Sequence, residues 1–130
     1  ESHWPASRLP CRLPADCWVR GNLNALAQAL ENILRNAIRH SPAHGVVTLD
    51  GCREGDEWHI WLEDQGGGIA EQDLERIFAP FTRLEGSRPG NGGFGLGLSI
   101  ARNAVQRQGG RLWAENSGQG LRVHLRLRAG

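Results

Sequence analysis

Segment 121–128 restricts the possible folds of this chain more than any other feature of its sequence. Its residues, LRVHLRLR, alternate strictly between apolar and polar side chains. A period of two predicts a β-strand that is buried on one face only. Segment 57–63, EWHIWLE, alternates in the same way, so the two segments require a sheet with one covered face. We expect an inward set of Leu121, Val123, Leu125, Leu127, Trp58, Ile60 and Leu62, and an outward set of Arg122, His124, Arg126 and Arg128.

The order of the other predicted elements places helices on the covered face. The longest helix is expected at 23–40, where an apolar stripe at helical spacing comprises Leu26, Leu30, Ile33, Leu34 and Ala37. Because the strands follow one another as hairpins, we expect an α+β fold with a mixed, mostly antiparallel sheet and helices on one face. The full predicted order is a proline-rich extended entry at 1–16, a strand at 17–20, the helix at 23–40, strands at 46–50 and 57–63, a short helix at 71–78, a long mobile loop at 79–95, a helix at 96–108, and strands at 111–115 and 121–128.

All fifteen basic residues are arginine, because the chain contains no lysine. This excludes P-loop proteins, eukaryotic-type protein kinases and Schiff-base enzymes, each of which depends on a lysine side chain. The net charge of +1 gives no electrostatic indication of nucleic-acid binding. A length of 130 residues corresponds to one domain, and the lack of any methionine predicts that this domain is a piece of a longer protein.

The cysteine and histidine residues show no familiar metal-binding spacing. Their positions are Cys11, Cys17 and Cys52, and His3, His40, His44, His59 and His124. Neither set matches a zinc-ligand pattern, so the sequence predicts reduced thiols and no zinc site.

Three polar or glycine-rich segments carry candidate binding residues. Asn32 and Asn36 share one face of the long helix, where amide oxygens suit Mg²⁺ beside phosphate, although a solvated polar face gives the same pattern. Asp64 begins the loop DQGGG, where a carboxylate can accept an N–H from a base, although a turn that needs positive φ also explains the glycines. Residues 93–98, GFGLGL, offer backbone N–H groups for phosphate at the start of a helix.

The order of these segments is more specific than any one of them. An NxxxN helix is followed by DxGxG, by two phenylalanines around a proline at Phe78 and Phe81, and by GxGLGL. Over about residues 17–128 the chain resembles the catalytic, ATP-binding domain of bacterial two-component sensor histidine kinases. The resemblance implies that residues 1–130 form one such domain, a two-layer α/β sandwich with ATP under a flexible lid.

The resemblance also implies a role for each matching residue. Asn36 corresponds to the Mg²⁺ ligand and Asn32 to the asparagine one turn before it, while Arg39 corresponds to a residue that contacts phosphate; these three form the implied catalytic set. Asp64 corresponds to the acceptor of the adenine amino group, and His40 stands where a tyrosine usually lies beside the adenine. The other implied ATP-binding residues are Gly66, Gly68, Ile69, Phe78, Phe81, Arg83, Gly93, Gly95, Leu96, Gly97 and Leu98.

The implied activity is transfer of the γ-phosphoryl group of ATP to a histidine on a separate dimerisation domain. None of the five histidines lies in a phosphoacceptor motif, so we expect that histidine to lie outside this chain. The implied partners are ATP, the dimerisation domain and, indirectly, a response regulator. The isolated domain is expected to be monomeric and to belong to the cytoplasmic part of an inner-membrane sensor kinase.

Two alternatives stay open. Relatives with the same ATP-binding fold hydrolyse ATP or phosphorylate serine, and they use a glutamate one turn before the Mg²⁺ asparagine as a general base. Asn32 occupies that place and cannot accept a proton at neutral pH, and Glu31 points about 100° away on the helix. The second alternative is a nucleotide-sensing module without catalysis.

Overall fold

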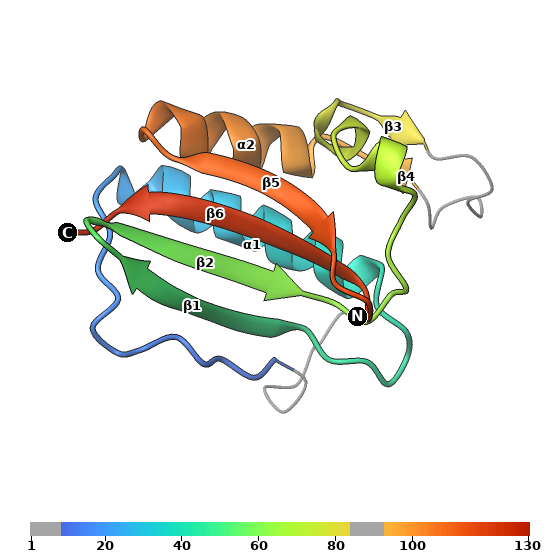
Figure 1. The fold of residues 1–130 in the computed structure, drawn as a ribbon. Coiled ribbons are helices and arrows are strands. Elements are labelled where there is room, and N and C mark those ends of the chain that lie inside the picture. Colours follow the sequence, from blue (N-terminus) through green and yellow to red (C-terminus); the bar gives the residue numbers. More distant parts are fainter. Residues whose placement is uncertain (1–8, 84–92) are drawn as a thin grey trace.

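A four-stranded antiparallel sheet forms one layer of the fold in the computed structural model, which describes residues 9–83 and 93–130. The spatial order is β1-β2-β6-β5 (Figure 1). The strands are β1 (Thr48–Glu54), β2 (Glu57–Glu63), β5 (Arg111–Asn116) and β6 (Leu121–Arg128). Their register aligns the apolar positions of neighbouring strands, as in the pairs Trp58–Leu127 and Leu62–Val123. The expected inward set is therefore confirmed, and all seven of its side chains are buried.

Two helices form the second layer and lie side by side over one face of the sheet (Figure 1). The first, α1 (Leu23–Arg39), begins at Asn22, whose side chain accepts a hydrogen bond from the N–H of Ala25 at 2.9 Å. The second, α2 (Gly97–Arg107), buries Leu98, Ala101 and Val105 against the same core. The predicted stripe of α1 faces the sheet, with Leu26, Ile33 and Ala37 buried and Leu30 and Leu34 at its edge.

Several expected elements differ in extent. The expected strand at 17–20 is reduced to one antiparallel bridge, Val19–Ala129, because the chain turns at Gly21 into α1 directly afterwards. The helix expected at 71–78 is two 3₁₀ turns, η2 (Glu71–Asp73) and η3 (Arg76–Phe78), a common form for segments too short to nucleate an α-helix. Among the described residues, the parallel component of the sheet is a single bridge, Cys11–Leu49.

The outer face of the sheet is less solvated than its alternation predicts. His124 points outward as expected, yet its exposed fraction is only 5%. The ring of Trp113 stacks on it with centroids 5.0 Å apart and planes inclined by 6°, and His59 lies on β2 beside it. His124 therefore lies on the expected face of the sheet, but cross-strand aromatic neighbours cover its imidazole.

The loop expected at 79–95 is described only at its two ends. Here β3 (Thr82–Arg83) pairs with β4 (Gly93–Phe94) as a short antiparallel ladder, with Thr82 opposite Phe94. Residues 84–92, the greater part of the expected lid, lie outside the described residues, and the lid stays a prediction. Of the helices described, none is long and apolar enough to cross a lipid bilayer.

Candidate functional site

The polar face of α1 and the start of α2 enclose a pocket of about 220 Å³. Its lining residues are Asn32, Arg35, Asn36, Arg39, Gly95, Leu96, Gly97 and Leu98. The structure therefore brings together the NxxxN helix and the glycine-rich segment, which are about 60 residues apart in sequence. Arg35 is a pocket residue that the sequence analysis did not name. An arginine four residues after Glu31 is explained by an ion pair along the helix, so its position alone did not indicate a binding role.

The chemistry of this pocket suits a polyphosphate with a hard cation. Among the described residues, no side chain caps the N-terminus of α2, so its first-turn N–H groups are available to an anion. The guanidinium groups of Arg35 and Arg39 add positive charge on the opposite wall. The amide oxygens of Asn32 and Asn36 are neutral hard donors, which suit Mg²⁺ that is also held by phosphate oxygens. A Cβ at Gly97 would lie 3.8 Å from that of Asn32, in ordinary van der Waals contact, so Gly97 and Asn32 face each other directly.

The second part of the site is built around Asp64 at the end of β2. The carboxylate is buried, with an exposed fraction of 3%. Its Oδ1 accepts hydrogen bonds from the N–H groups of Gly66 and Leu121, both at 3.0 Å. Burial raises the pKa of Asp64, and the two backbone donors oppose that rise. Because Oδ1 is engaged by the backbone, Oδ2 is the oxygen that a ligand N–H would find.

Close backbone approaches explain why glycines surround this carboxylate. A Cβ at Gly66 would lie 2.2 Å from the carbonyl oxygen of His40, and a Cβ at Gly120 would lie 2.2 Å from that of Asp64. Gly68 adopts φ +80°, where residues other than glycine are strained. Backbone packing and positive φ therefore require part of the DxGxG pattern, in agreement with the alternative that these glycines form a turn.

His40 connects the two parts of the site. It ends α1, eight residues after Asn32, so Asn32, Asn36 and His40 follow one another in four-residue steps over about 12 Å of helix. Its carbonyl packs against the Gly66 loop. Burial, and to a smaller extent Arg39, lowers the pKa of the His40 imidazole, which favours the neutral ring near pH 7.

The two phenylalanines lie in different environments. Phe78 is buried in the core, and the guanidinium carbon of Arg102 lies 4.6 Å from its ring centroid. Phe81 is 74% exposed and has φ 58°, an unusual value for a residue other than glycine. Its N–H donates to the carbonyl of Gly95 at 3.1 Å, which ties the chain after Phe78 to the glycine-rich segment. Arg83 and Gly93 are paired in the β3–β4 ladder, and contact of the Arg83 side chain with phosphate stays a prediction.

Asn116 is a positioning residue that the sequence did not reveal. Its Oδ1 accepts from the N–H of Ile69 at 2.9 Å, and its Nδ2 donates to the carbonyl of Ile69 at 2.7 Å. The same Nδ2 donates to Glu71 at 3.0 Å. One side chain at the end of β5 therefore fixes the exit of the Asp64–Gly68 loop. The contact spans 47 residues, and neither Asn116 nor Ile69 lies in a motif that would pair them.

Replacement of Asn116 by alanine is expected to loosen this loop. Both backbone groups of Ile69 lose their partner, which should lower the free energy of unfolding by about 1–2 kcal/mol and weaken nucleotide binding several-fold. Denaturant unfolding and nucleotide titration measure the two effects. Asn103→Ala, an exposed position on α2, is the matched control, and equal values for the two variants would contradict the role of Asn116.

The family described as histidine kinase-, DNA gyrase B- and HSP90-like ATPases matches residues 21–130. The sensor protein PfeS of Pseudomonas aeruginosa is 61% identical over 129 residues, which are 99% of this chain and 28% of that protein. The sensor histidine kinase CpxA of Escherichia coli is 39% identical over 119 residues, which are 90% of this chain and 26% of that protein. The chain thus spans little more than a quarter of these curated relatives.

Solved structures give the same assignment. The mycobacterial sensor histidine kinase MprB aligns with a TM-score of 0.78 and 29% identity, covering 95% of this chain and 83% of that one. The ATP-binding domain of PrrB from Mycobacterium tuberculosis aligns with a TM-score of 0.71 and 27% identity, covering 98% of this chain and 83% of that one. CpxA and MprB are sensor histidine kinases and PfeS is a sensor protein, and this chain belongs with them to the family of histidine kinase-, DNA gyrase B- and HSP90-like ATPases.

Proposed function

We propose that this domain binds Mg-ATP between α1 and α2 and donates the γ-phosphoryl group to a histidine of a separate dimerisation domain. One observation carries the proposal. Asn32 and Asn36 on α1 line the same pocket as the glycine-rich start of α2. The similarity to the sensor histidine kinases CpxA and MprB supports the same activity. We also propose that the isolated domain is monomeric and that the whole protein acts on a response regulator through its phosphorylated histidine. In the whole protein this domain would lie on the cytoplasmic side of an inner membrane.

The residues present fit a magnesium ion in this role. Asn36 would supply an amide oxygen, with Asn32 beside it, and the remaining ligands would come from phosphate and water. When bound, Mg²⁺ supplies charge neutralisation on the phosphates. The chain itself orients the nucleotide: Asp64 would accept from the adenine amino group, and the N–H groups of α2 with Arg39 would hold the phosphates in place.

The transfer does not require a residue of this domain to form a covalent intermediate. A nitrogen of the acceptor imidazole would form a bond to the γ-phosphorus, the bond from that phosphorus to the β,γ-bridging oxygen would break, ADP would leave, and the imidazole would lose its N–H proton to solvent. Such reactions depend mainly on positioning and on stabilisation of charge. The described lining residues of the pocket provide this without any acidic side chain.

Hydrolysis of ATP is disfavoured by where the acidic residues lie. Asn32 occupies the position at which a hydrolase would carry its general base. Glu31 lines a different, apolar groove with Leu30 and Leu34, and its carboxylate pairs with Arg35 at 3.2 Å. A water molecule in the phosphate pocket would therefore have no carboxylate from α1 to accept its proton.

Transfer of radiolabel from γ-labelled ATP tests the proposal. The chain alone is expected to bind ATP but neither to label itself nor to release phosphate appreciably. Addition of a dimerisation domain with its histidine should produce label on that histidine alone, and replacement of that histidine by alanine is the control. Robust label on this chain by itself, or fast phosphate release, would favour the hydrolase or serine-kinase alternative.

A further inference from the structure

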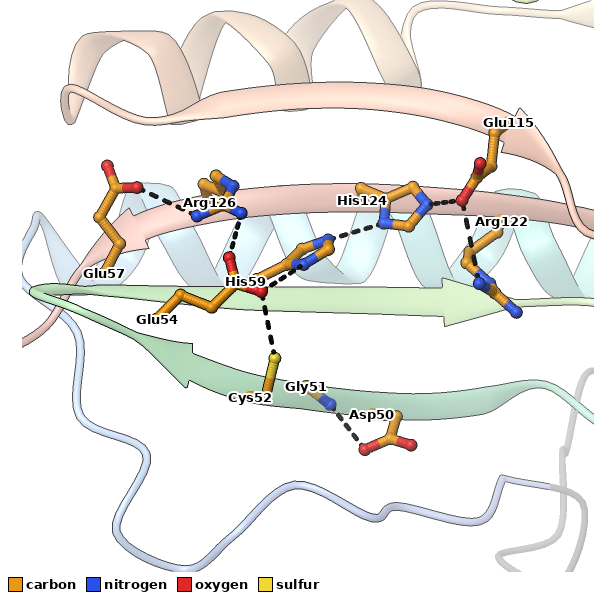
Figure 2. A network of polar contacts seen from close by, with 10 residues as sticks. All are labelled: Asp50, Gly51, Cys52, Glu54, Glu57, His59, Glu115, Arg122, His124 and Arg126. Carbon is orange, nitrogen blue, oxygen red and sulfur yellow. Dashed lines mark hydrogen bonds and ion pairs between the residues drawn. The ribbon is translucent and has the colours of Figure 1, made fainter.

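The outer face of the β1–β2 hairpin carries a second group of chemically competent side chains, far from the helices. Cys52 on β1 and His59 on β2 are direct cross-strand partners, and Glu54 lies two residues beyond Cys52 on the same face. Figure 2 shows the three side chains converging on one point above the hairpin. They lie on the side of the sheet opposite to α1 and α2, and therefore opposite to the nucleotide pocket (Figures 1 and 2).

The spacing of these atoms is close to that of a tetrahedral metal centre. Glu54 Oε2 lies 3.6 Å from Cys52 Sγ and 3.8 Å from His59 Nδ1, and all three ligand atoms lie within 4.8 Å of one another. Ordinary zinc–sulfur, zinc–nitrogen and zinc–oxygen bonds in tetrahedral geometry would place oxygen ~3.6 Å from sulfur and ~3.4 Å from nitrogen. The sulfur and nitrogen atoms lie within 4.8 Å of each other and would have to approach to about 3.6 Å, so metal binding requires rotation of the side chains as well as contraction.

A chain of hydrogen bonds determines which nitrogen of His59 is free for a ligand. Glu115 can only accept, so the 2.5 Å contact with His124 Nε2 places a proton on that nitrogen. In a neutral ring His124 Nδ1 is then an acceptor, and its 2.8 Å contact with His59 Nε2 places a proton there. In a neutral His59 the other nitrogen, Nδ1, then carries no proton and is the one available to a ligand.

The consequence is an unusual pairing of acceptors. With His59 neutral, its Nδ1 lone pair lies 3.8 Å from Glu54 Oε2, so a metal ion between the two atoms would be bound by both. The other oxygen of Glu54 is held by Arg126, which directs Oε2 toward the cluster. Metal-binding histidines commonly donate their second N–H to an outer partner in this manner, and here that partner is the His124–Glu115 pair.

We propose that Cys52, Glu54 and His59 bind one thiophilic divalent transition-metal ion, of the Zn²⁺ class, with solvent in the fourth position. The sulfur ligand favours such ions over Mg²⁺ and Ca²⁺. Binding replaces the thiol proton of Cys52, which passes to solvent, by the metal. The linear sequence gave no sign of this set, because C-x-E and a histidine five residues later become neighbours only through the two-residue turn of the hairpin.

Titration of the reduced, nucleotide-free chain with Co²⁺ tests the site, because Co²⁺ reports its own coordination. The expected result is one Co²⁺ per chain, with thiolate charge-transfer absorption and the intense visible bands of tetrahedral Co²⁺, both abolished by equimolar Zn²⁺. Cys52→Ser should remove the charge-transfer absorption. Glu54→Gln should keep it but weaken Co²⁺ affinity at least about tenfold, because a carboxylate ligand is lost.

Matched thiol variants make the test specific. Cys11→Ser and Cys17→Ser should leave the Co²⁺ spectrum unchanged, and Cys52→Ser should keep the wild-type circular dichroism and Mg-ATP affinity. Because Mg-ATP binding is measured separately, failure of the metal site and failure of the proposed kinase activity are distinguishable. A spectrum like that of aqueous Co²⁺, or one that survives in Cys52→Ser, would overturn the proposal.

Discussion

Replacement of Asn36 by alanine is expected to remove most of the Mg²⁺-dependent affinity for ATP. The amide oxygen of Asn36 lies in the pocket between α1 and α2, and alanine offers no ligand in its place. We expect a loss of about 100-fold, equivalent to about 2.7 kcal/mol of binding free energy. Calorimetric titration with ATP, in the presence and absence of Mg²⁺, measures the change and its dependence on the metal.

The control for this variant lies on the same helix. Asn24→Ala removes an exposed asparagine two turns or more from the pocket and should bind Mg-ATP like the unmodified chain. Because Asn36 points away from the apolar stripe of α1, both variants should keep the wild-type unfolding midpoint. Wild-type Mg-ATP affinity in a folded Asn36→Ala protein would show that Asn36 does not hold the metal.

Replacement of Asp64 by asparagine is expected to reverse the base preference of the site. The backbone donors of Gly66 and Leu121 should retain the remaining amide oxygen as their acceptor, so the new NH₂ group takes the place of Oδ2. An NH₂ group repels the adenine amino group but can donate to the carbonyl of guanine. We expect ATP affinity to fall by at least about 100-fold, while GTP binding improves.

Competition titrations with ATP and GTP on the two proteins measure this change. The unmodified chain should prefer ATP strongly, because a buried carboxylate and a guanine carbonyl are both acceptors. Asp64→Ala is a less informative variant, since it would leave two buried N–H groups unpaired and cost about 1–3 kcal/mol of stability for each. Equal affinities of the unmodified chain for ATP and GTP would contradict the role of Asp64.

Local sequence patterns predicted the elements whose burial is periodic. The bounds 57–63 and 121–128 agree with β2 and β6, because strict alternation fixes both the type and the face of a strand. The helix at 23–40 ends one residue earlier than expected. The strand at 46–50 was shifted, since β1 runs from Thr48 to Glu54 and includes polar residues that gave no alternation.

The candidate site was predictable where one segment carries several of its residues. Asn32, Asn36 and His40 follow from helical spacing, and the structure places the first two opposite Gly95 and Gly97. Asn116 and Arg102 were not predictable, because each acts on a segment far away in the chain. The burial of His124 was missed for the same reason. It depends on Trp113 in a neighbouring strand, and the sequence of one strand does not show which residues of another strand will lie beside it.

The hydrogen bond that Asp64 Oδ1 accepts from the N–H of Leu121 joins the end of β2 to the start of β6, and the bond from Gly66 closes the loop between them. The side chain proposed to select the base thus also holds two strands of the sheet together, and the glycines around it permit backbone approaches that any Cβ would prevent. Selectivity and folding stability are therefore coupled at this residue, so substitutions that remove the Oδ1 acceptor change expression and lifetime in the cell as well as base preference. A new nucleotide preference that evolves through such substitutions would first require a higher free energy of unfolding, so that the protein still folds once the Oδ1 acceptor is lost.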